Sequence, residues 1–132
     1  RSFEPIINDG GSILTLTFYG SNKVIPNYNL MGIAKAALET SVKYLSVDLG
    51  TKNIRVNAIS AGPMRTIAGA AINNAREVFK FTKKHSALKR NAQLDEIGKS
   101  ALYFVSDMSS AVTGEVHYVD CGFKAIGMPS PK

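Results

Sequence analysis

The sequence predicts an α/β protein built on a parallel sheet, because strand-like and helix-like segments alternate along the chain. Short segments rich in β-branched residues alternate with longer segments whose apolar residues recur at helical spacing. Such alternation is typical of parallel strands joined by crossover helices. The 132 residues are 45% hydrophobic and 20% charged, which suits one small globular domain with a core. We therefore expect a single domain over residues 1–132.

The first strand and the helix after it are predicted by residue type and turn signals. Residues 12–18 (SILTLTF) form a short apolar segment rich in Ile, Leu and Thr, as in a buried strand. Pro26 predicts the start of a long helix, because proline lacks only an N–H that has no helical partner at that position. Gly50 predicts the end of this helix after Leu49. The apolar residues at helical spacing within it are Ile33, Ala37, Val42, Leu45 and Leu49.

Two more strands and two more helices complete the predicted alternation. Residues 54–60 (IRVNAIS) and 115–120 (EVHYVD) predict the second and third strands. Between them, residues 64–84 predict a helix with few bulky anchors, and residues 94–106 predict a helix with a clear apolar side. Residues 123–132 contain two prolines and no periodicity, which predicts a tail. The apolar side of the 94–106 helix comprises Leu94, Ile97, Ala101, Leu102 and Val105.

Charge and composition narrow the classes of partner. With 16 Lys and Arg against 10 Asp and Glu, the net charge is +6, which favours an anionic cofactor, nucleic acid or an acidic protein. Nucleic acid is disfavoured, because there is no Trp and no ladder of aromatic residues among the basic ones. No apolar stretch is long enough for a membrane span, and the first residues do not resemble a signal peptide. The single Cys121 indicates a reducing cytoplasm, and we expect no metal site.

The most informative pair of residues is Tyr28 and Lys35, near the start of the long helix. Seven residues are almost two helical turns, so both side chains are expected on one face, with Met31 between them. Parallel α/β sheets bind ligands at the carboxyl ends of their strands, toward which this pair would project. A phenol can donate to an oxygen that gains negative charge, and a nearby cation favours that charge. The same residues also fit an ordinary helix with a half-buried tyrosine and a surface lysine.

Four blocks in the same order resemble one known family. They are residues 10–17 (GGSILTLT), 25–36 (IPNYNLMGIAKA), 54–66 (IRVNAISAGPMRT) and 113–123 (TGEVHYVDCGF). Together they resemble the enoyl-acyl-carrier-protein reductases of bacterial fatty acid synthesis, which are divergent short-chain dehydrogenase/reductases. The Tyr-x6-Lys spacing is the discriminating detail, because ordinary members of that superfamily use Tyr-x3-Lys. The resemblance implies a Rossmann-like doubly wound parallel sheet, of which this chain would be the carboxyl-terminal half.

The resemblance also implies a reaction and its cofactor. The family reduces the 2,3 double bond of a trans-2-enoyl thioester on acyl carrier protein with hydride from a nicotinamide, and the resemblance favours NADH over NADPH. Tyr28 would donate to the thioester oxygen as the enolate forms. Lys35 would hold the nicotinamide ribose, and Met64 and Thr66 match positions beside the cofactor, although a packing methionine and a capping threonine fit equally well. Family members are commonly tetramers, so a cytoplasmic homotetramer is expected.

Residues 64–90 match the family's substrate-binding segment. By resemblance, the acyl pocket would be lined by Phe18, Met31, Ile72 and Val78. Without the resemblance, the last three fit core positions. Basic residues of the segment would attract acidic acyl carrier protein, although they also fit a solvated charged face. These residues are Arg76, Lys80, Lys83, Lys84, Lys89 and Arg90.

Two departures from the family pattern concern the substrate pocket. The family usually has a second tyrosine ten residues before the catalytic one, and Phe18 at that position cannot donate a hydrogen bond. Strand alternation predicts that Tyr19 points to the opposite face and does not replace it. Ala75 stands where a bulky aromatic residue is common, which would loosen the acyl pocket.

A third departure concerns the glycine-rich loop that the family places in the first half of its fold. Gly10 and Gly11 precede a strand and do not open a helix, so the chain resembles the second half alone. An amino-terminal half is therefore an expected partner, and without it the outer edge of residues 12–18 would be unpaired. Two other interpretations stay open. One is an inactive remnant of a reductase, and the other is a basic fragment that binds acyl carrier protein or assembles with other subunits.

Overall fold

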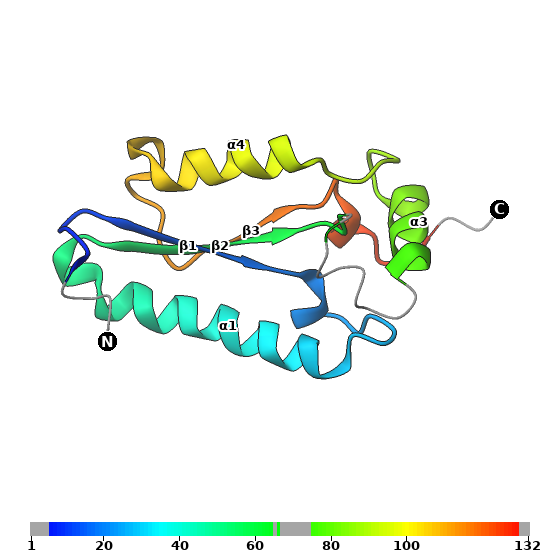
Figure 1. Cartoon of the computed structure of the whole chain (residues 1–132), viewed down its shortest axis with the longest axis horizontal. Coiled ribbons are helices and arrows are strands. Elements are labelled where there is room, and N and C mark those ends of the chain that lie inside the picture. The colour runs from blue at the N-terminus through cyan, green and yellow to red at the C-terminus, as the bar shows by residue number, and fades with distance from the viewer. Residues whose placement is uncertain (1–5, 65, 67–74, 130–132) are drawn as a thin grey trace.

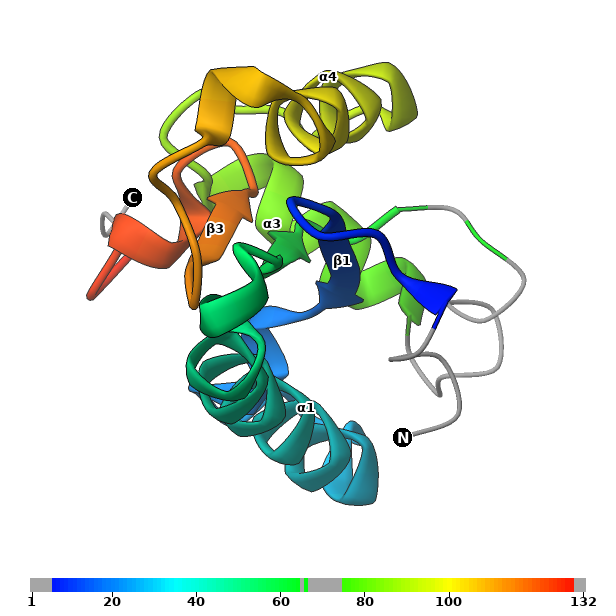
Figure 2. The same ribbon diagram turned by 90° about the vertical axis from the view of Figure 1, so that its left-hand side faces the viewer.

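A sheet lies between two long helices, with α4 on one face and α1 on the other (Figures 1 and 2). The structure is a computed structural model, and it describes residues 6–64, 66 and 75–129. The layered arrangement confirms the predicted α/β class, with three parallel strands and crossover helices. The strands are β1 (Ser12–Thr17), β2 (Arg55–Ala61) and β3 (Val116–Val119), and the helices are α1 (Asn29–Asp48), α3 (Ala75–His85) and α4 (Leu94–Val105).

The strands follow one another in space as they do in the chain, in the order β1-β2-β3. β2 is central, and every one of its residues is buried. The β1–β2 register runs from Ser12 opposite Arg55 to Thr17 opposite Ser60. Among the described residues, no strand pairs with the other edge of β1. All three strands point the same way, so their carboxyl ends meet at one end of the molecule.

Two apolar clusters hold the helices to the sheet. Side chains alternate along a strand, so successive residues of β2 contribute to opposite faces. On the α1 side the buried cluster consists of Val42, Leu49, Ile54, Val56 and Ala58. On the α4 side it consists of Ile59, Ala61, Ala92, Ile97 and Phe104.

The start of α1 differs from the prediction. Pro26 lies in a turn, and the helix begins three residues later at Asn29, with Tyr28 as its N-cap. Asn27 and Asn29 have φ angles of 64° and 38°, in the left-handed region that asparagine tolerates better than most residues. This turn delays the helix and leaves Tyr28 at the junction between loop and helix.

Only part of the apolar face predicted for the long helix packs on the sheet. Val42 is buried as expected, but Ile33 is 69% exposed and Leu45 is 41% exposed. The buried residues of the helix are Glu39, Val42 and Ser46. The two polar ones make hydrogen bonds, which removes most of the penalty for burying them.

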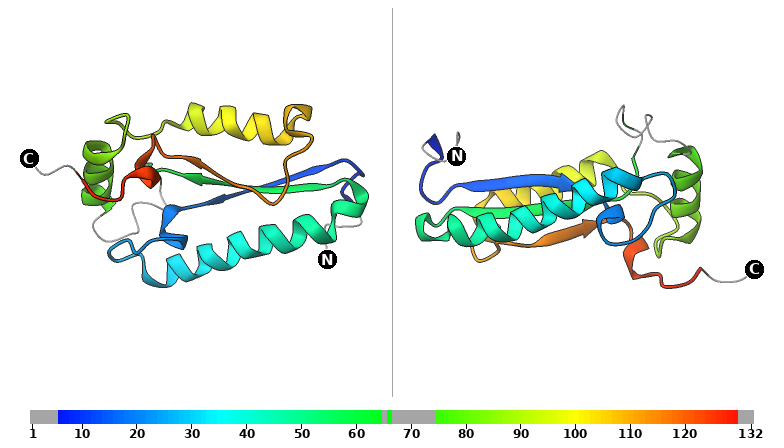
Figure 3. Two further views of the ribbon diagram at one scale, coloured as in Figure 1. Left: turned by 180° about the vertical axis from the view of Figure 1, so that it is seen from behind. Right: turned by 90° about the horizontal axis from the view of Figure 1, so that it is seen from below.

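The other two helices cover the second face and one end of the sheet. In α4, Ile97 is buried as predicted, but Leu94 and Leu102 are exposed and the unpredicted Phe104 is the most buried residue. α3 lies beyond the carboxyl ends of the strands (Figure 3). It matches the last part of the predicted 64–84 helix, whose earlier part lies almost entirely outside the described residues. Within the described ranges, no helix combines the length and the apolar character that a membrane span requires.

Candidate active site

A cavity of about 580 Å³ opens between the carboxyl ends of the strands and α3. Its wall comes from the residues that follow each strand, from the turn η2 (Tyr19–Ser21), from the loop after that turn, and from α3. Ligands of parallel α/β sheets bind at this end, so the cavity lies where the sequence predicts a site. The described residues that line it are Phe18, Tyr19, Lys23, Val24, Ile25, Pro26, Gly62, Pro63, Glu77, Val78, Lys80, Phe81, Thr82, Lys84, Asp120 and Phe123.

Tyr28 lies directly behind this wall and is only 5% exposed. Its ring packs edge-on against Phe18, with ring centroids 5.0 Å apart, and Phe18 also lines the cavity. No described residue holds the Tyr28 hydroxyl by a hydrogen bond. Burial raises the pKa of Tyr28 above its ordinary value, because the phenolate is poorly solvated there. The phenol therefore remains protonated at neutral pH and can act as a hydrogen-bond donor.

Lys35 lies almost two turns further along α1 and reaches the same strand end. Its Nζ donates to the carbonyl oxygen of Leu16 in β1 at 2.9 Å. An ammonium group has three donors, so two remain for a ligand. Leu16 and Phe18 are two residues apart, so Lys35 and Tyr28 both contact the carboxyl end of β1.

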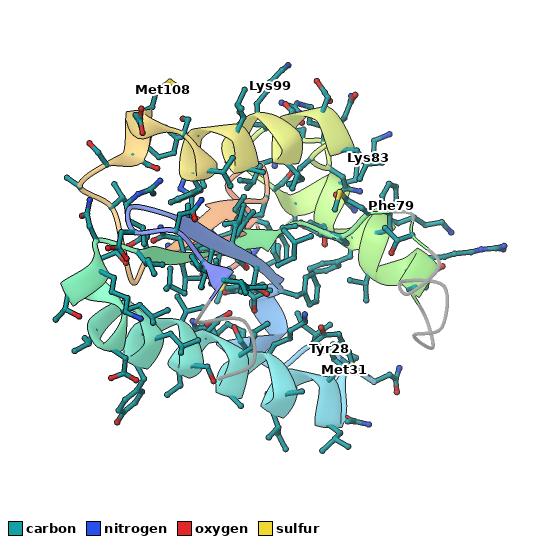
Figure 4. All side chains as sticks on the ribbon, turned by 60° about the vertical axis from the view of Figure 1, so that its left-hand side comes forward. Tyr28, Met31, Phe79, Lys83, Lys99 and Met108 are labelled. Carbon is teal, nitrogen blue, oxygen red and sulfur yellow. The ribbon has the colours of Figure 1, made fainter. Side chains whose placement is uncertain are left out.

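Only part of the predicted substrate-binding set lines the cavity. Phe18, which directly follows β1, and Val78 of α3 do so. Met31 is half exposed at the start of α1, at the same end of the molecule as α3 (Figure 4). Tyr28, Met31 and Lys35 are not among the described residues that line the cavity.

The remaining predicted residues are in the segment after β2. Met64 is partly buried and packs against the cluster on the α4 side of the sheet. Thr66 is exposed. Ile72 lies outside the described residues. The described contacts of Met64 are thus those of a packing residue.

The aromatic wall of the cavity was not identified from the sequence. Tyr19, Phe81 and Phe123 line it. The ring of Phe123 lies 5.9 Å from that of Tyr19 and 6.2 Å from that of Phe81, and both contacts are edge-on. Phe81 had a usable signal, because it lies three residues after Val78 on an amphipathic helix and so shares its face.

The reason given for the orientation of Tyr19 does not apply, although its ring contacts Tyr118 and Phe123 and not Tyr28. β1 ends at Thr17, and Tyr19 begins the turn η2, so the alternation of side chains along a strand does not extend to it. Phe18 and Tyr19 consequently both line the cavity. The hydroxyl group that Phe18 lacks is therefore present on the neighbouring residue, at a different place in the wall.

Basic side chains contribute to the cavity wall, and two basic residues of the predicted substrate-binding segment are engaged within the fold. Lys80 and Lys84 line the cavity, and Lys80 pairs with Glu77 at 3.1 Å. Arg90 donates to both carboxylate oxygens of Glu96, at 2.8 and 2.6 Å. This contact, with a bond from a backbone N–H, lowers the pKa of Glu96 to about 2. In the part of the chain that the structure describes, no group of three His, Cys, Asp or Glu side chains could hold a metal ion.

Comparison with known proteins gives matches along almost the whole chain. An enoyl-[acyl-carrier-protein] reductase [NADH] 1 of Rhizobium meliloti is 58% identical over 125 residues, which are 95% of this chain and 46% of that protein. The crystal structure of the Anaplasma phagocytophilum reductase in complex with NAD is 54% identical, with a TM-score of 0.90 over 97% of this chain and 49% of that one. The Bacillus cereus reductase, solved with NADP+ and an indole naphthyridinone, is 45% identical, with a TM-score of 0.86. The match covers 89% of this chain and 46% of that one.

The chain spans about half the length of the curated relatives it matches. Its structure superimposes on the corresponding half of the solved ones, including the parallel strands at whose ends the cavity opens. Residues 1–124 match the protein family described as Enoyl-(Acyl carrier protein) reductase. Both the strand order and the sequence agree, and the chain therefore belongs to the enoyl-(acyl carrier protein) reductase family.

Proposed function

We propose that this chain is the catalytic half of a cytoplasmic reductase that uses NADH to reduce the 2,3 double bond of trans-2-enoyl-acyl-carrier-protein in fatty acid biosynthesis. The observation that carries the proposal is the environment of Tyr28, a buried phenol beside the cavity whose hydroxyl no described residue holds. The names of relatives that are 58% identical support both the reaction and the choice of NADH.

Tyr28 would stabilise the negative charge that collects on the thioester oxygen when the β-carbon is reduced. Its hydroxyl would donate a hydrogen bond to that oxygen, and the interaction strengthens as the oxygen becomes an enolate. Two features support this role. The raised pKa keeps the proton on the phenol, and burial lowers the local dielectric constant, which makes a hydrogen bond to an anion stronger than in water.

Lys35 would hold the hydroxyl groups of the nicotinamide ribose, and the cofactor would supply the hydride. The contact with Leu16 supports this role, because it fixes the ammonium at the strand end with two donors unused. The positive charge would also favour the enolate. Met64 and Thr66 would lie beside the cofactor, as the resemblance implies.

The acyl chain would occupy the cavity. Its apolar wall, which includes Phe18, Val78 and Phe81, suits a hydrocarbon chain. Residues 64–90 would form the substrate-binding segment, with Met31 and Ile72 completing the pocket. Lys80 and Lys84 at the wall would attract the acidic carrier protein.

The whole enzyme would need an amino-terminal half and further subunits. The open edge of β1 would pair with a strand of that half, which would also bring the glycine-rich loop for the cofactor. A homotetramer would cover exposed apolar residues of α1, which include Leu30, Ile33, Leu45 and Val47.

The test joins the amino-terminal half of the Rhizobium meliloti reductase to residues 1–132, and we call the product the fusion protein. The assay follows the oxidation of NADH, and separately of NADPH, with a crotonyl thioester of acyl carrier protein. Turnover that neither half supports alone is the expected result. A folded fusion protein that binds NADH without oxidising it contradicts the proposal. If that protein still binds acyl carrier protein, a binding or assembly role replaces the enzymatic one.

Two substitutions test the separate roles of the pair. Tyr28→Phe should lower kcat by about 10²-fold and leave the Kd of NADH unchanged, because the hydroxyl meets charge that develops in the transition state. Lys35→Ala should mainly raise the Kd of NADH. Single-turnover kinetics and NADH fluorescence titration measure the two effects. Tyr103→Phe, at an exposed tyrosine of α4, is the matched control. An unchanged kcat in Tyr28→Phe would remove Tyr28 from the chemistry.

A further inference from the structure

Glu39 is a buried carboxylate on the face of α1 that packs against the sheet. It is 8% exposed. Its Oε1 accepts hydrogen bonds from Thr17 Oγ1 at 2.6 Å and from Ser21 Oγ at 2.5 Å. A carboxylate loses solvation when it is buried, and short hydrogen bonds of this kind are what compensate for that loss. A polar residue with specific partners at this place in the fold calls for an explanation beyond packing.

The two donors lie at either end of the segment that contacts Tyr28. Thr17 is the last residue of β1, and Ser21 is the last residue of η2. Between them, Phe18 places its ring 5.0 Å from the ring of Tyr28. One carboxylate oxygen therefore fixes both ends of a five-residue segment whose interior forms the wall against Tyr28.

Two glycines show how closely this segment approaches α1. A Cβ atom on Gly20 would lie 2.4 Å from Cδ1 of Tyr28, and a Cβ atom on Gly32 would lie 2.7 Å from the carbonyl oxygen of Gly20. Both distances are shorter than any carbon contact allows. A shift of the segment by a fraction of an ångström would therefore move the ring of Tyr28 or open a gap beside it.

We propose that Glu39 is a positioning residue for Tyr28. It ties the end of β1 and the turn η2 to α1, and the segment so held fixes the position of the phenol beside the cavity. No hydrogen bond from a described residue orients the Tyr28 hydroxyl, so its direction depends on the packing of the ring. The role rests on the proposed function, because it matters for catalysis only if Tyr28 acts on the substrate.

The test measures Glu39→Leu and Glu39→Gln in the fusion protein. Glu39→Leu has no acceptor for the two hydroxyls, and we expect kcat to fall by about 10²-fold, as for a small misplacement of a catalytic group, with the Kd of NADH unchanged. Glu39→Gln keeps an oxygen acceptor in a side chain of the same shape, so its kcat should be close to that of the native fusion protein. Glu115→Leu, at an exposed carboxylate before β3, is the matched control and should keep the native kcat.

A second measurement does not depend on turnover. The titration of Tyr28 is followed by tyrosinate absorbance, after subtraction of the spectrum of each variant combined with Tyr28→Phe. We expect Tyr28 to titrate at lower pH in Glu39→Leu, because the displaced ring is better solvated. A role confined to stability would lower the unfolding temperature and leave both kcat of the folded protein and this titration unchanged.

The outcomes separate the two proposals. If the native fusion protein does not oxidise NADH, the proposed function fails, and the titration still decides the positioning role. If it does, unchanged kcat and unchanged titration in folded Glu39→Leu overturn the positioning role alone. If Glu39→Leu does not fold, Ser21→Ala is measured instead. This change removes the hydroxyl donor at the partly exposed end of the 17–21 segment and should lower kcat by less than Glu39→Leu would. An unchanged kcat in Ser21→Ala overturns the proposal.

Discussion

Gly20 is the position where the least space is left beside Tyr28. An added methyl group would meet the Tyr28 ring at 2.4 Å, and the ring cannot withdraw without losing its contact with Phe18. We expect Gly20→Ala to lower the free energy of unfolding by about 1–3 kcal/mol, as for other overpacked sites, and to lower kcat of the fusion protein. Urea unfolding and steady-state kinetics measure the two effects.

Gly50→Ala is the control for this change, because a Cβ atom at Gly50 meets no atom within 4 Å. It should leave kcat at the native value. If both variants lost kcat equally, the loss in Gly20→Ala could not be attributed to the lack of space beside Tyr28.

Single residues also mark the limit of what the sequence predicts. The spacing of Tyr28 and Lys35 indicates a pair, and the structure brings both to the end of β1. The confinement of Tyr28 does not follow from its spacing, because it depends on the close approach of Gly20 from another segment. The prediction for Tyr19 has a different weakness, because it carried the alternation of a strand to a residue beyond the strand predicted at 12–18.

At the scale of elements, α1 shows why apolar periodicity predicts only part of a buried face. The sequence points correctly to Val42 but also to Ile33 and Leu45, which are exposed. The other buried residues of the helix are Glu39 and Ser46. Two polar residues can face inward because the sheet and the helix supply hydrogen-bond partners, which a hydropathy pattern cannot reveal. The class and approximate bounds of the elements were predictable, because they depend on local propensity and turn residues.

The helix α4 allows a prediction with the opposite sign to that for Gly20. Gly98 is exposed within the helix, and a Cβ atom there meets nothing within 4 Å. Gly98→Ala should raise the free energy of unfolding by about 1 kcal/mol, because alanine has less backbone entropy to lose in a helix. Gly114→Ala is the contrast, since Gly114 has a φ of 74° and a Cβ atom there would lie 2.9 Å from Ser46 Oγ, so this change should destabilise. Thermal unfolding compares the two, and a loss of stability in Gly98→Ala would contradict the expectation.

At the scale of the whole molecule, the open edge of β1 governs how the chain behaves by itself. We expect the β1 amides that do not bond to β2 to exchange with solvent faster than those of β2 in the 132-residue chain. In the fusion protein the same amides should become protected, because a neighbouring strand would pair with them. Hydrogen-exchange mass spectrometry with peptide resolution compares the two states. Equal exchange of β1 in both would mean that the amino-terminal half does not dock at this edge.

The strand order carries a consequence for how the protein is made. Chain order and spatial order coincide, so each crossover places the next strand beside the one translated just before it. A ribosome therefore releases β2 after β1 and β3 after β2, so each of these two strands emerges after its neighbour, and the sheet can lengthen in one direction during synthesis. β2 remains covered on one side only until β3 emerges, more than fifty residues later, which makes that interval the one in which a nascent-chain chaperone would find an apolar strand to bind.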